Sequence, residues 1–154
     1  VEFDNSGFVK AWNSSKKKLV LVGVNLDEKI DKEVLKVLSQ DSSVIVMTEI
    51  TSNISDANFF TNIDSILAPI EQESDSVLLF EALQPEMLIT FGGLIVSKKI
   101  KKFLRQYKPK QHFHIDPREA NDTFFSLTQH FETSVNSFLK TIRSSFDDFH
   151  PTYF

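Results

Sequence analysis

Short apolar runs alternate along the chain with longer stretches in which apolar residues recur every three or four positions. The short runs are rich in β-branched residues, which predicts buried strands, and the longer stretches have the period of amphipathic helices. This alternation predicts the α/β class, with a Rossmann-like, doubly wound, mainly parallel sheet of about 5–6 strands and helices on both faces. Strands are expected at 19–24, 44–47, 87–91, 111–115 and 124–127.

Capping residues and prolines indicate where the helices begin and end. Asp27 is a suitable N-cap for the helix that follows the first strand. The stretch 57–70 is expected to be helical and to end at Pro69. A further helix is expected over 71–83, where an acidic first turn suits the helix dipole and the apolar residues face inward.

The stretch after the third expected strand combines a glycine pair, Gly92 and Gly93, with a helix rich in lysine. Lys98 and Lys99 fall in the first turn of that helix, where the partial positive charge of the helix end disfavours cations. Ligands of open α/β sheets bind at the carboxyl ends of strands, so these two lysines are candidates for an anion site. The alternative is a solvated lysine face, which is the commoner outcome of such a pattern.

Other polar residues carry weaker signals. His112 and His114 fall on the same side of an expected strand, but two histidines without a third ligand indicate packing and hydrogen bonding more than a metal site. Glu49 follows another strand and is expected to be a structural hydrogen-bond acceptor. Lys16 to Lys18 are interpreted as a charged flank of the first strand.

Composition restricts the classes of function. With 154 residues, 41% hydrophobic and 25% charged, the chain is expected to form one globular domain. A net charge of −4 argues against a nucleic-acid binder. The absence of cysteine excludes disulfides, and no apolar run is long enough to span a membrane. No signal peptide, G-x-G-x-x-G motif or P-loop is present, so a cytoplasmic protein without a dinucleotide fingerprint is expected.

The block from Ile89 to Leu104, followed by His112 to Asp116, resembles the central domain of the MenD family. These are the 2-succinyl-5-enolpyruvyl-6-hydroxy-3-cyclohexene-1-carboxylate synthases of menaquinone biosynthesis, which depend on thiamine diphosphate. The segments 19–23 and 48–53 also fit the pattern, so the similarity covers most of the chain.

The resemblance implies a division of the chain into a lead-in over 1–17, the central domain over 18–146 and a tail over 147–154 that leads to the next domain. A start at Val1 without methionine also indicates a piece of a longer protein. The aromatic residues of the tail, among them Tyr153 and Phe154, are expected to pack against a part of the protein outside this chain.

The resemblance also implies a function. The full-length enzyme would be a transferase that decarboxylates 2-oxoglutarate and adds the succinyl unit to isochorismate. Thiamine diphosphate and Mg²⁺ would be bound by other domains of a homo-oligomer, with no catalytic, cofactor-binding or metal-binding residue in this fragment. Lys98 and Lys99 match the basic pair that contacts the substrate carboxylates in this family. The fragment alone is expected to be inactive.

Two other classes remain open. The chain resembles, less closely, the central domains of other thiamine-diphosphate enzymes, such as the acetolactate synthase group, which bind a flavin or a nucleotide. It is also compatible with a stand-alone module whose basic helix binds an anion or an acidic partner. A nucleic-acid role ranks last.

Overall fold

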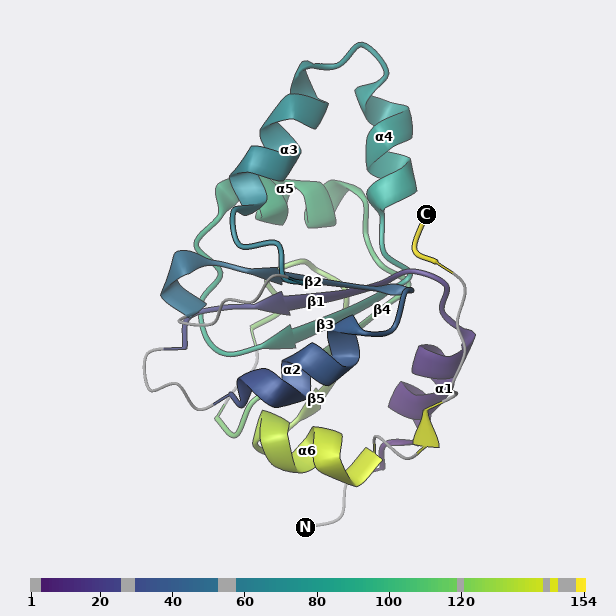
Figure 1. Ribbon diagram of the computed structural model, residues 1–154, viewed down its shortest axis with the longest axis vertical. Coiled ribbons are helices and arrows are strands. Elements are labelled where there is room, and N and C mark those ends of the chain that lie inside the picture. Colours follow the sequence, from purple (N-terminus) through teal and green to yellow (C-terminus); the bar gives the residue numbers. More distant parts are fainter. Residues whose placement is uncertain (1–3, 26–29, 53–57, 119–120, 143–144, 147–151) are drawn as a thin grey trace.

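The computed structural model describes residues 4–25, 30–52, 58–118, 121–142, 145–146 and 152–154. Their centre is a five-stranded sheet in which every neighbouring pair of strands is parallel, in the order β2-β1-β3-β4-β5 (Figure 1). The strands are β1 (Lys18–Val22), β2 (Val44–Thr48), β3 (Met87–Phe91), β4 (Gln111–Ile115) and β5 (Leu127–Phe131). The predicted α/β fold with a parallel sheet is therefore confirmed.

Helices cover both faces of the sheet because its central strands are apolar on both sides. Val20 and Val22 of β1 belong to a core cluster with residues of α1, α2 and α6, whereas Leu19 and Leu21 belong to a second cluster with residues of α3, α4 and α5. Figure 1 shows these two groups of helices on opposite sides of the sheet. The helices are α1 (Ser6–Ser14), α2 (Lys32–Ser39), α3 (Ile63–Gln72), α4 (Ser76–Leu83), α5 (Lys98–Gln106) and α6 (Val135–Ile142), with a 3₁₀ turn, η1 (Ile50–Ser52).

Helix α1 lies where the sequence predicts only a lead-in segment. Phe8 and Trp12, one turn apart, are buried in the core, and their rings stack on Phe146 near the other end of the chain. Both aromatics therefore pack within this domain. The domain limits at 17/18 and 146/147 stay a prediction.

Two helix boundaries differ from the predicted ones. Asp27 lies outside the described residues, and Asp31 is the N-cap of α2, with its carboxylate accepting a hydrogen bond from the Glu33 N–H at 2.9 Å. Pro69 does not end α3, which continues to Gln72. Pro69 and Ser65 are both exposed, so water can hydrate the carbonyl that the proline leaves without its N–H partner.

The predicted helix 71–83 is wrong in its first turn, and only part of its predicted inward face is buried. Glu71 belongs to the end of α3, and α4 begins only at Ser76. Leu83 is buried, whereas Val77 is 56% exposed. The reason is the arrangement in Figure 1, where α3 and α4 project beyond α5 and only the lower parts of this pair of helices approach the sheet.

The last strand begins later than predicted. Asp122 accepts hydrogen bonds from the backbone N–H groups of Ser126 and Leu127, both at 2.9 Å, and Phe125 has a positive φ of 57°. These contacts make a turn of residues 122–126, so the strand expected at 124–127 is β5, at Leu127–Phe131.

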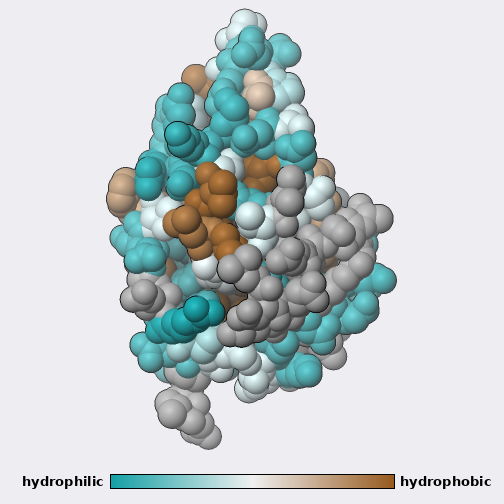
Figure 2. All heavy atoms as spheres, turned by 90° about the vertical axis from the view of Figure 1, so that its left-hand side faces the viewer, coloured by the Kyte–Doolittle hydropathy of each residue, from teal (hydrophilic) through white to brown (hydrophobic). Residues whose placement is uncertain are grey.

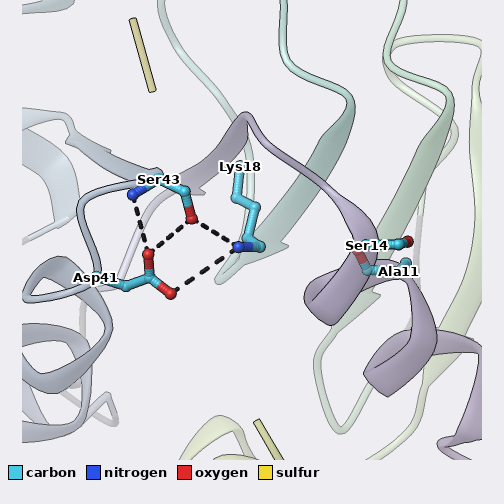
Figure 3. Close-up of polar contacts among 5 residues, drawn as sticks. All are labelled: Ala11, Ser14, Lys18, Asp41 and Ser43. Atoms are coloured by element: carbon cyan, nitrogen blue, oxygen red, sulfur yellow. Dashed lines mark hydrogen bonds and ion pairs between the residues drawn. The ribbon is translucent and has the colours of Figure 1, made fainter. Parts of the chain in front are cut away.

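The amino end of the sheet holds a buried lysine, contrary to the interpretation of Lys16 to Lys18 as a solvated flank. Lys18 is 0% exposed, and its Nζ donates to Ser43 Oγ at 2.6 Å and lies 3.9 Å from Asp41 Oδ2 (Figure 3). Its ammonium also lies 4.8 Å from the centre of the Trp12 ring. A buried charge is tolerated when it is paired in this way.

The carboxy-terminal residues partly close the same end. Tyr153 is buried, its hydroxyl donates to the Leu83 carbonyl at 2.5 Å, and its N–H donates to the Ser42 carbonyl at 3.0 Å. Burial raises the pKa of Tyr153, so the hydroxyl stays protonated. Tyr153 thus packs within the domain, contrary to the prediction, whereas Phe154 is 72% exposed. Phe149 lies outside the described residues.

Candidate functional site

A cleft of about 580 Å³ opens at the carboxyl ends of β1, β3 and β4. The chain leaves β1 toward β2 on one side and returns to β3 on the other, so the strand order reverses between β1 and β3. Such a reversal leaves a crevice at the carboxyl ends of the two strands, which is the usual ligand position in open α/β sheets. Figure 2 views the side toward which these strands point and shows a hydrophobic patch among hydrophilic side chains.

Glycines allow the loops after β1 and β3 to approach each other here: Gly23 follows β1, and Gly92 and Gly93 follow β3. Gly92 has a φ of +76°, a conformation that disfavours other residues. A Cβ at Gly23 would lie 2.2 Å from the Gly93 carbonyl oxygen. The Gly23 N–H donates to the Phe91 carbonyl and the Gly93 N–H donates to the Val24 carbonyl, both at 2.9 Å. The glycine pair seen in the sequence therefore shapes one wall of the cleft.

Buried polar residues that line the cleft include Thr90, His112 and His114, and we call these three its floor. Thr90 Oγ1 lies 2.7 Å from His112 Nε2 and 2.6 Å from His114 Nδ1, so one hydroxyl joins the two imidazoles. The parallel register places Thr90 opposite His114, and His112 lies two residues earlier on the same face of β4. Their same-side arrangement was predicted, but the role of Thr90 was not.

Both histidines are held neutral by their surroundings. Burial, followed by the neighbouring His114, lowers the pKa of His112 to about 4, against a smaller opposing effect of Asp122. Burial is also the main cause that lowers the pKa of His114, which Asp116 opposes. At neutral pH the cleft floor is therefore a neutral hydrogen-bonding surface.

The residues that the structure describes contain no group of three or more His, Cys, Asp or Glu side chains able to hold a metal ion. The preferred interpretation of the histidines, packing with hydrogen bonds, is confirmed by their contacts with Thr90. The described residues therefore do not offer such a set of side chains for magnesium. Among the helices so described, none is long and apolar enough to cross a membrane.

The two lysines predicted to bind substrate lie beside the cleft rather than in it. Leu94 and Ile95 of the β3–α5 connection line the cleft, but Lys98 and Lys99 do not. Lys98 is exposed. Lys99 donates from Nζ to Glu71 Oε2 of α3 at 2.8 Å, and this hydrogen bond is the largest cause that raises the pKa of Lys99.

Protein carboxylates already lie at the amino end of α5. Glu49 accepts hydrogen bonds from the N–H groups of Val96 and Ser97 at 2.9 and 2.6 Å, as expected of a structural acceptor. Ser97, the N-cap of α5, donates from Oγ to Asp64 Oδ1 at 2.7 Å. Anionic groups are favourable at a helix N-terminus, so these carboxylates offset the placement of lysines there. The anomaly in the sequence thus has a structural explanation within the domain.

A second basic surface follows along α5. Lys98, Lys101, Lys102 and Arg105 line a shallow hollow on the outer face of this helix. Arg105 Nε donates to the Thr123 carbonyl at 2.8 Å, and its guanidinium lies 4.8 Å from the centre of the Phe125 ring. This face agrees with the solvated lysine face that the sequence offered as the alternative.

Comparison with known proteins gives consistent matches. Residues 6–147 match the protein family described as "Middle domain of thiamine pyrophosphate". The chain is 52% identical over 133 residues to the 2-succinyl-5-enolpyruvyl-6-hydroxy-3-cyclohexene-1-carboxylate synthase of Flavobacterium psychrophilum, covering 86% of this chain and 23% of that protein. For the synthases of the same name from Flavobacterium johnsoniae and Bacteroides thetaiotaomicron, the identities are 49% over 135 residues and 31% over 153 residues. Those alignments cover 87% and 97% of this chain, but only 24% and 26% of the relatives. The chain thus spans about a quarter of the length of these proteins.

Proposed function

The chain belongs to the family of thiamine pyrophosphate enzyme middle domains, and from this membership we propose that it is the central domain of a MenD-type synthase. The observation that carries the proposal is the identity with the Flavobacterium psychrophilum synthase over most of this chain. The complete enzyme, a cytoplasmic homo-oligomer, decarboxylates 2-oxoglutarate and adds the succinyl unit to isochorismate. Thiamine diphosphate and Mg²⁺ are bound by its other domains.

The part of this chain in that reaction is support and substrate contact. Bound thiamine diphosphate supplies the carbanion chemistry in enzymes of this kind, and protein side chains supply orientation and charge. The described residues contain no group of three or more side chains able to hold the metal, and no chemical step is assigned to them. What this chain contributes is a rigid parallel sheet and the basic amino end of α5 beside the cleft.

Lys98 and Lys99 are the residues that we assign to the substrate carboxylates. Lys98 is exposed and carries a full positive charge that can pair with a carboxylate of the dianionic acceptor. Lys99 pairs with Glu71 at 2.8 Å in this structure, and both side chains are about one-third exposed. A partly exposed ion pair is weak enough for a substrate carboxylate to compete with Glu71 for the ammonium.

The test uses the complete enzyme with its cofactors, assayed for synthase activity with 2-oxoglutarate and isochorismate. The variants Lys98→Ala and Lys99→Ala should each raise KM for isochorismate by about tenfold, because each removes one charged contact. The thermal midpoint should stay unchanged. Lys102→Ala, an exposed lysine of the same helix, is the matched control and should leave KM as it is.

Two results would contradict this function. If the complete enzyme bound a flavin or a nucleotide and lacked synthase activity, the chain would belong to another thiamine-diphosphate enzyme. If Lys98→Ala lowered stability and activity together, with KM unchanged, the side chain would have a structural role. The 154-residue chain by itself should be inactive in the same assay.

A further inference from the structure

The contacts of Thr90, His112 and His114 determine where their protons lie. Thr90 is 4% exposed and His112 is 1% exposed, so neither can complete its hydrogen bonds freely with water. His112 Nδ1 is sealed from solvent and has no hydrogen-bond partner among the described residues. Thr90 Oγ1 touches both imidazoles, and a hydroxyl has one proton to donate.

Three proton arrangements satisfy these contacts. If both histidines donate to Thr90, the threonine hydroxyl proton is left buried without an acceptor. If His114 donates to Thr90 and Thr90 donates to His112, then His112 carries its proton on Nδ1, again a buried donor without an acceptor. If His112 donates from Nε2 to Thr90 and Thr90 donates to His114 Nδ1, only a lone pair on His112 Nδ1 stays unpaired.

The third arrangement has the lowest free energy, because a buried N–H or O–H donor without an acceptor is the rarer and costlier defect. It assumes neutral imidazoles, and burial keeps the pKa of His112 at about 4. In this arrangement His114 must carry its proton on Nε2, since its Nδ1 accepts from Thr90. Within the described part of the chain, His114 Nε2 has no hydrogen-bond partner and is not among the polar atoms buried away from solvent. Because His114 lines the cleft, that N–H is a donor available to a bound molecule.

The charge of the cleft indicates what kind of molecule would accept this hydrogen bond. Among the described residues that line the cleft, those of the floor are neutral, and Asp116 and Arg118 at the rim carry opposite charges. His130, whose Nε2 lies 2.9 Å from the Asp116 carbonyl, is the next imidazole, 5.6 Å from His114 between ring centres. A buried carboxylate would lose its hydration without a net positive charge to replace it. An uncharged carbonyl oxygen meets no such cost.

We propose that this cleft is a binding site for a small uncharged carbonyl compound, such as an amide or a lactam, whose oxygen accepts the hydrogen bond of His114 Nε2–H. Thr90 is the positioning residue, because its hydroxyl fixes the tautomer of His114. Gly92 and Gly93 leave one wall without side chains, so a molecule can approach the backbone there.

The first experiment measures the proton positions directly in the 154-residue chain, by ¹⁵N nuclear magnetic resonance of the imidazoles at neutral pH. Both His112 and His114 should show a protonated Nε2 and an unprotonated Nδ1. A protonated Nδ1 on His114 would overturn the proposal, since the donor would then point at Thr90 and not into the cleft. This measurement needs no variant to fold.

The second experiment adds 2-pyrrolidinone, an uncharged lactam, while the His114 Nε2–H resonance is followed. The resonance should shift in a saturable way, and butyrate, of similar size but anionic, should bind more weakly. Thr90→Val, which has the shape of threonine without the hydroxyl, should weaken lactam binding by about tenfold, and Thr90→Ser should restore it. Tighter binding of butyrate, no saturable shift with the lactam, or equal binding by the valine variant would each refute the site.

Discussion

The buried polar groups include a charge at the amino end of the central sheet and are neutral at its carboxyl end. We call the amino end, around Lys18, the closed end, and the carboxyl end, with its cleft, the open end. At the amino end, Lys18 carries a full charge into the interior and meets Ser43, Asp41 and the Trp12 ring. At the carboxyl end, the buried polar groups of Thr90, His112 and His114 are neutral, and they line an open cleft.

The difference follows from what each end connects. The Lys18 cluster joins α1, the start of β1 and the α2–β2 turn (Figure 3). Tyr153 joins the carboxy-terminal residues to the same end through Ser42 and Leu83. A paired buried charge there holds distant segments together. In the neutral cluster at the other end, each contact between Thr90 and a histidine joins one donor and one acceptor. The Nε2–H group of His114 is still available to the cleft as a donor. One end therefore serves stability, and the other is free for recognition.

The largest loss of stability at the open end is expected when the space between the loops that follow β1 and β3 is filled. In Gly23→Ala the new Cβ would lie 2.2 Å from the Gly93 carbonyl oxygen, a backbone atom that cannot move aside alone. We expect the free energy of unfolding to fall by about 3 kcal/mol or more, measured by urea denaturation. Gly7→Ala is the control, since no atom lies within 4 Å of the added carbon and α1 should gain about 0.5–1 kcal/mol. An unchanged midpoint for Gly23→Ala would show that the loops do not approach as described.

At the closed end, stability is expected to fall when the carboxylate that pairs with Lys18 is removed. Asp41→Ala leaves the Lys18 ammonium buried without its carboxylate and should cost about 2–3 kcal/mol, since Asp41 is partly exposed. Lys18→Met keeps the apolar stem and should cost only about 1 kcal/mol, because the carboxylate left behind can reach water. Urea denaturation measures the loss in free energy of unfolding for each variant. The ratio of the two losses tests whether the buried charge determines stability at this end. Equal losses would mean that the charge is not what matters at this end.

The neutral histidines should make the open end sensitive to acid. His112 has a pKa of about 4 in the folded chain and an ordinary value of 6.5 when unfolded. Since the unfolded state binds the proton more readily, this contribution to stability is present above pH 6.5 and is lost as the pH falls toward 4. The loss between pH 7 and pH 5 should be about 2 kcal/mol.

Two titratable neighbours of His112 set the control for that prediction. His114 opposes its protonation and Asp122 favours it, so both must be kept intact. The variant His112→Phe removes the titrating group and should show a flatter loss of stability between pH 7 and pH 5 in urea denaturation. Identical slopes for the variant and the parent chain would show that His112 is not responsible.

Much of the fold could be predicted because apolar period and strand length are local properties. The strands at 87–91 and 111–115 were predicted at their observed limits, and the family resemblance is confirmed by the match over residues 6–147. Helix α1 was missed because its apolar residues, Phe8, Val9, Ala11 and Trp12, lie between polar residues and glycine that are typical of a linker. Tertiary contacts account for the burial of Phe8 and Trp12: Phe8 packs against Phe113 and Phe138, and both rings stack on Phe146.

The candidate site was less predictable, for a physical reason. Lysines are visible in a sequence, but the carboxylates that offset them, Glu49 and Asp64, come from distant segments. In the sequence Lys18 looked like its neighbours Lys16 and Lys17, and only the sheet register places it beside Ser43. Thr90 gave no signal beyond its place in an apolar strand. A polar residue within a fully buried strand, next to a strand with two histidines on one face, is the pattern that could have found it.

The smallest effect is expected from the ion pair between Lys99 and Glu71, at the margin of the open end. Glu71→Gln removes the carboxylate, and since both side chains are partly exposed the thermal midpoint should hardly change. In the complete enzyme the same variant should lower KM for isochorismate, because Lys99 would no longer be shared between Glu71 and the substrate. The matched control is Glu73→Gln, because Glu73 is an exposed acid two residues after Glu71. A lower thermal midpoint with an unchanged KM would mean that Lys99 has a structural role, as Lys18 does at the other end of the sheet. Lys98 alone would then make the proposed substrate contact.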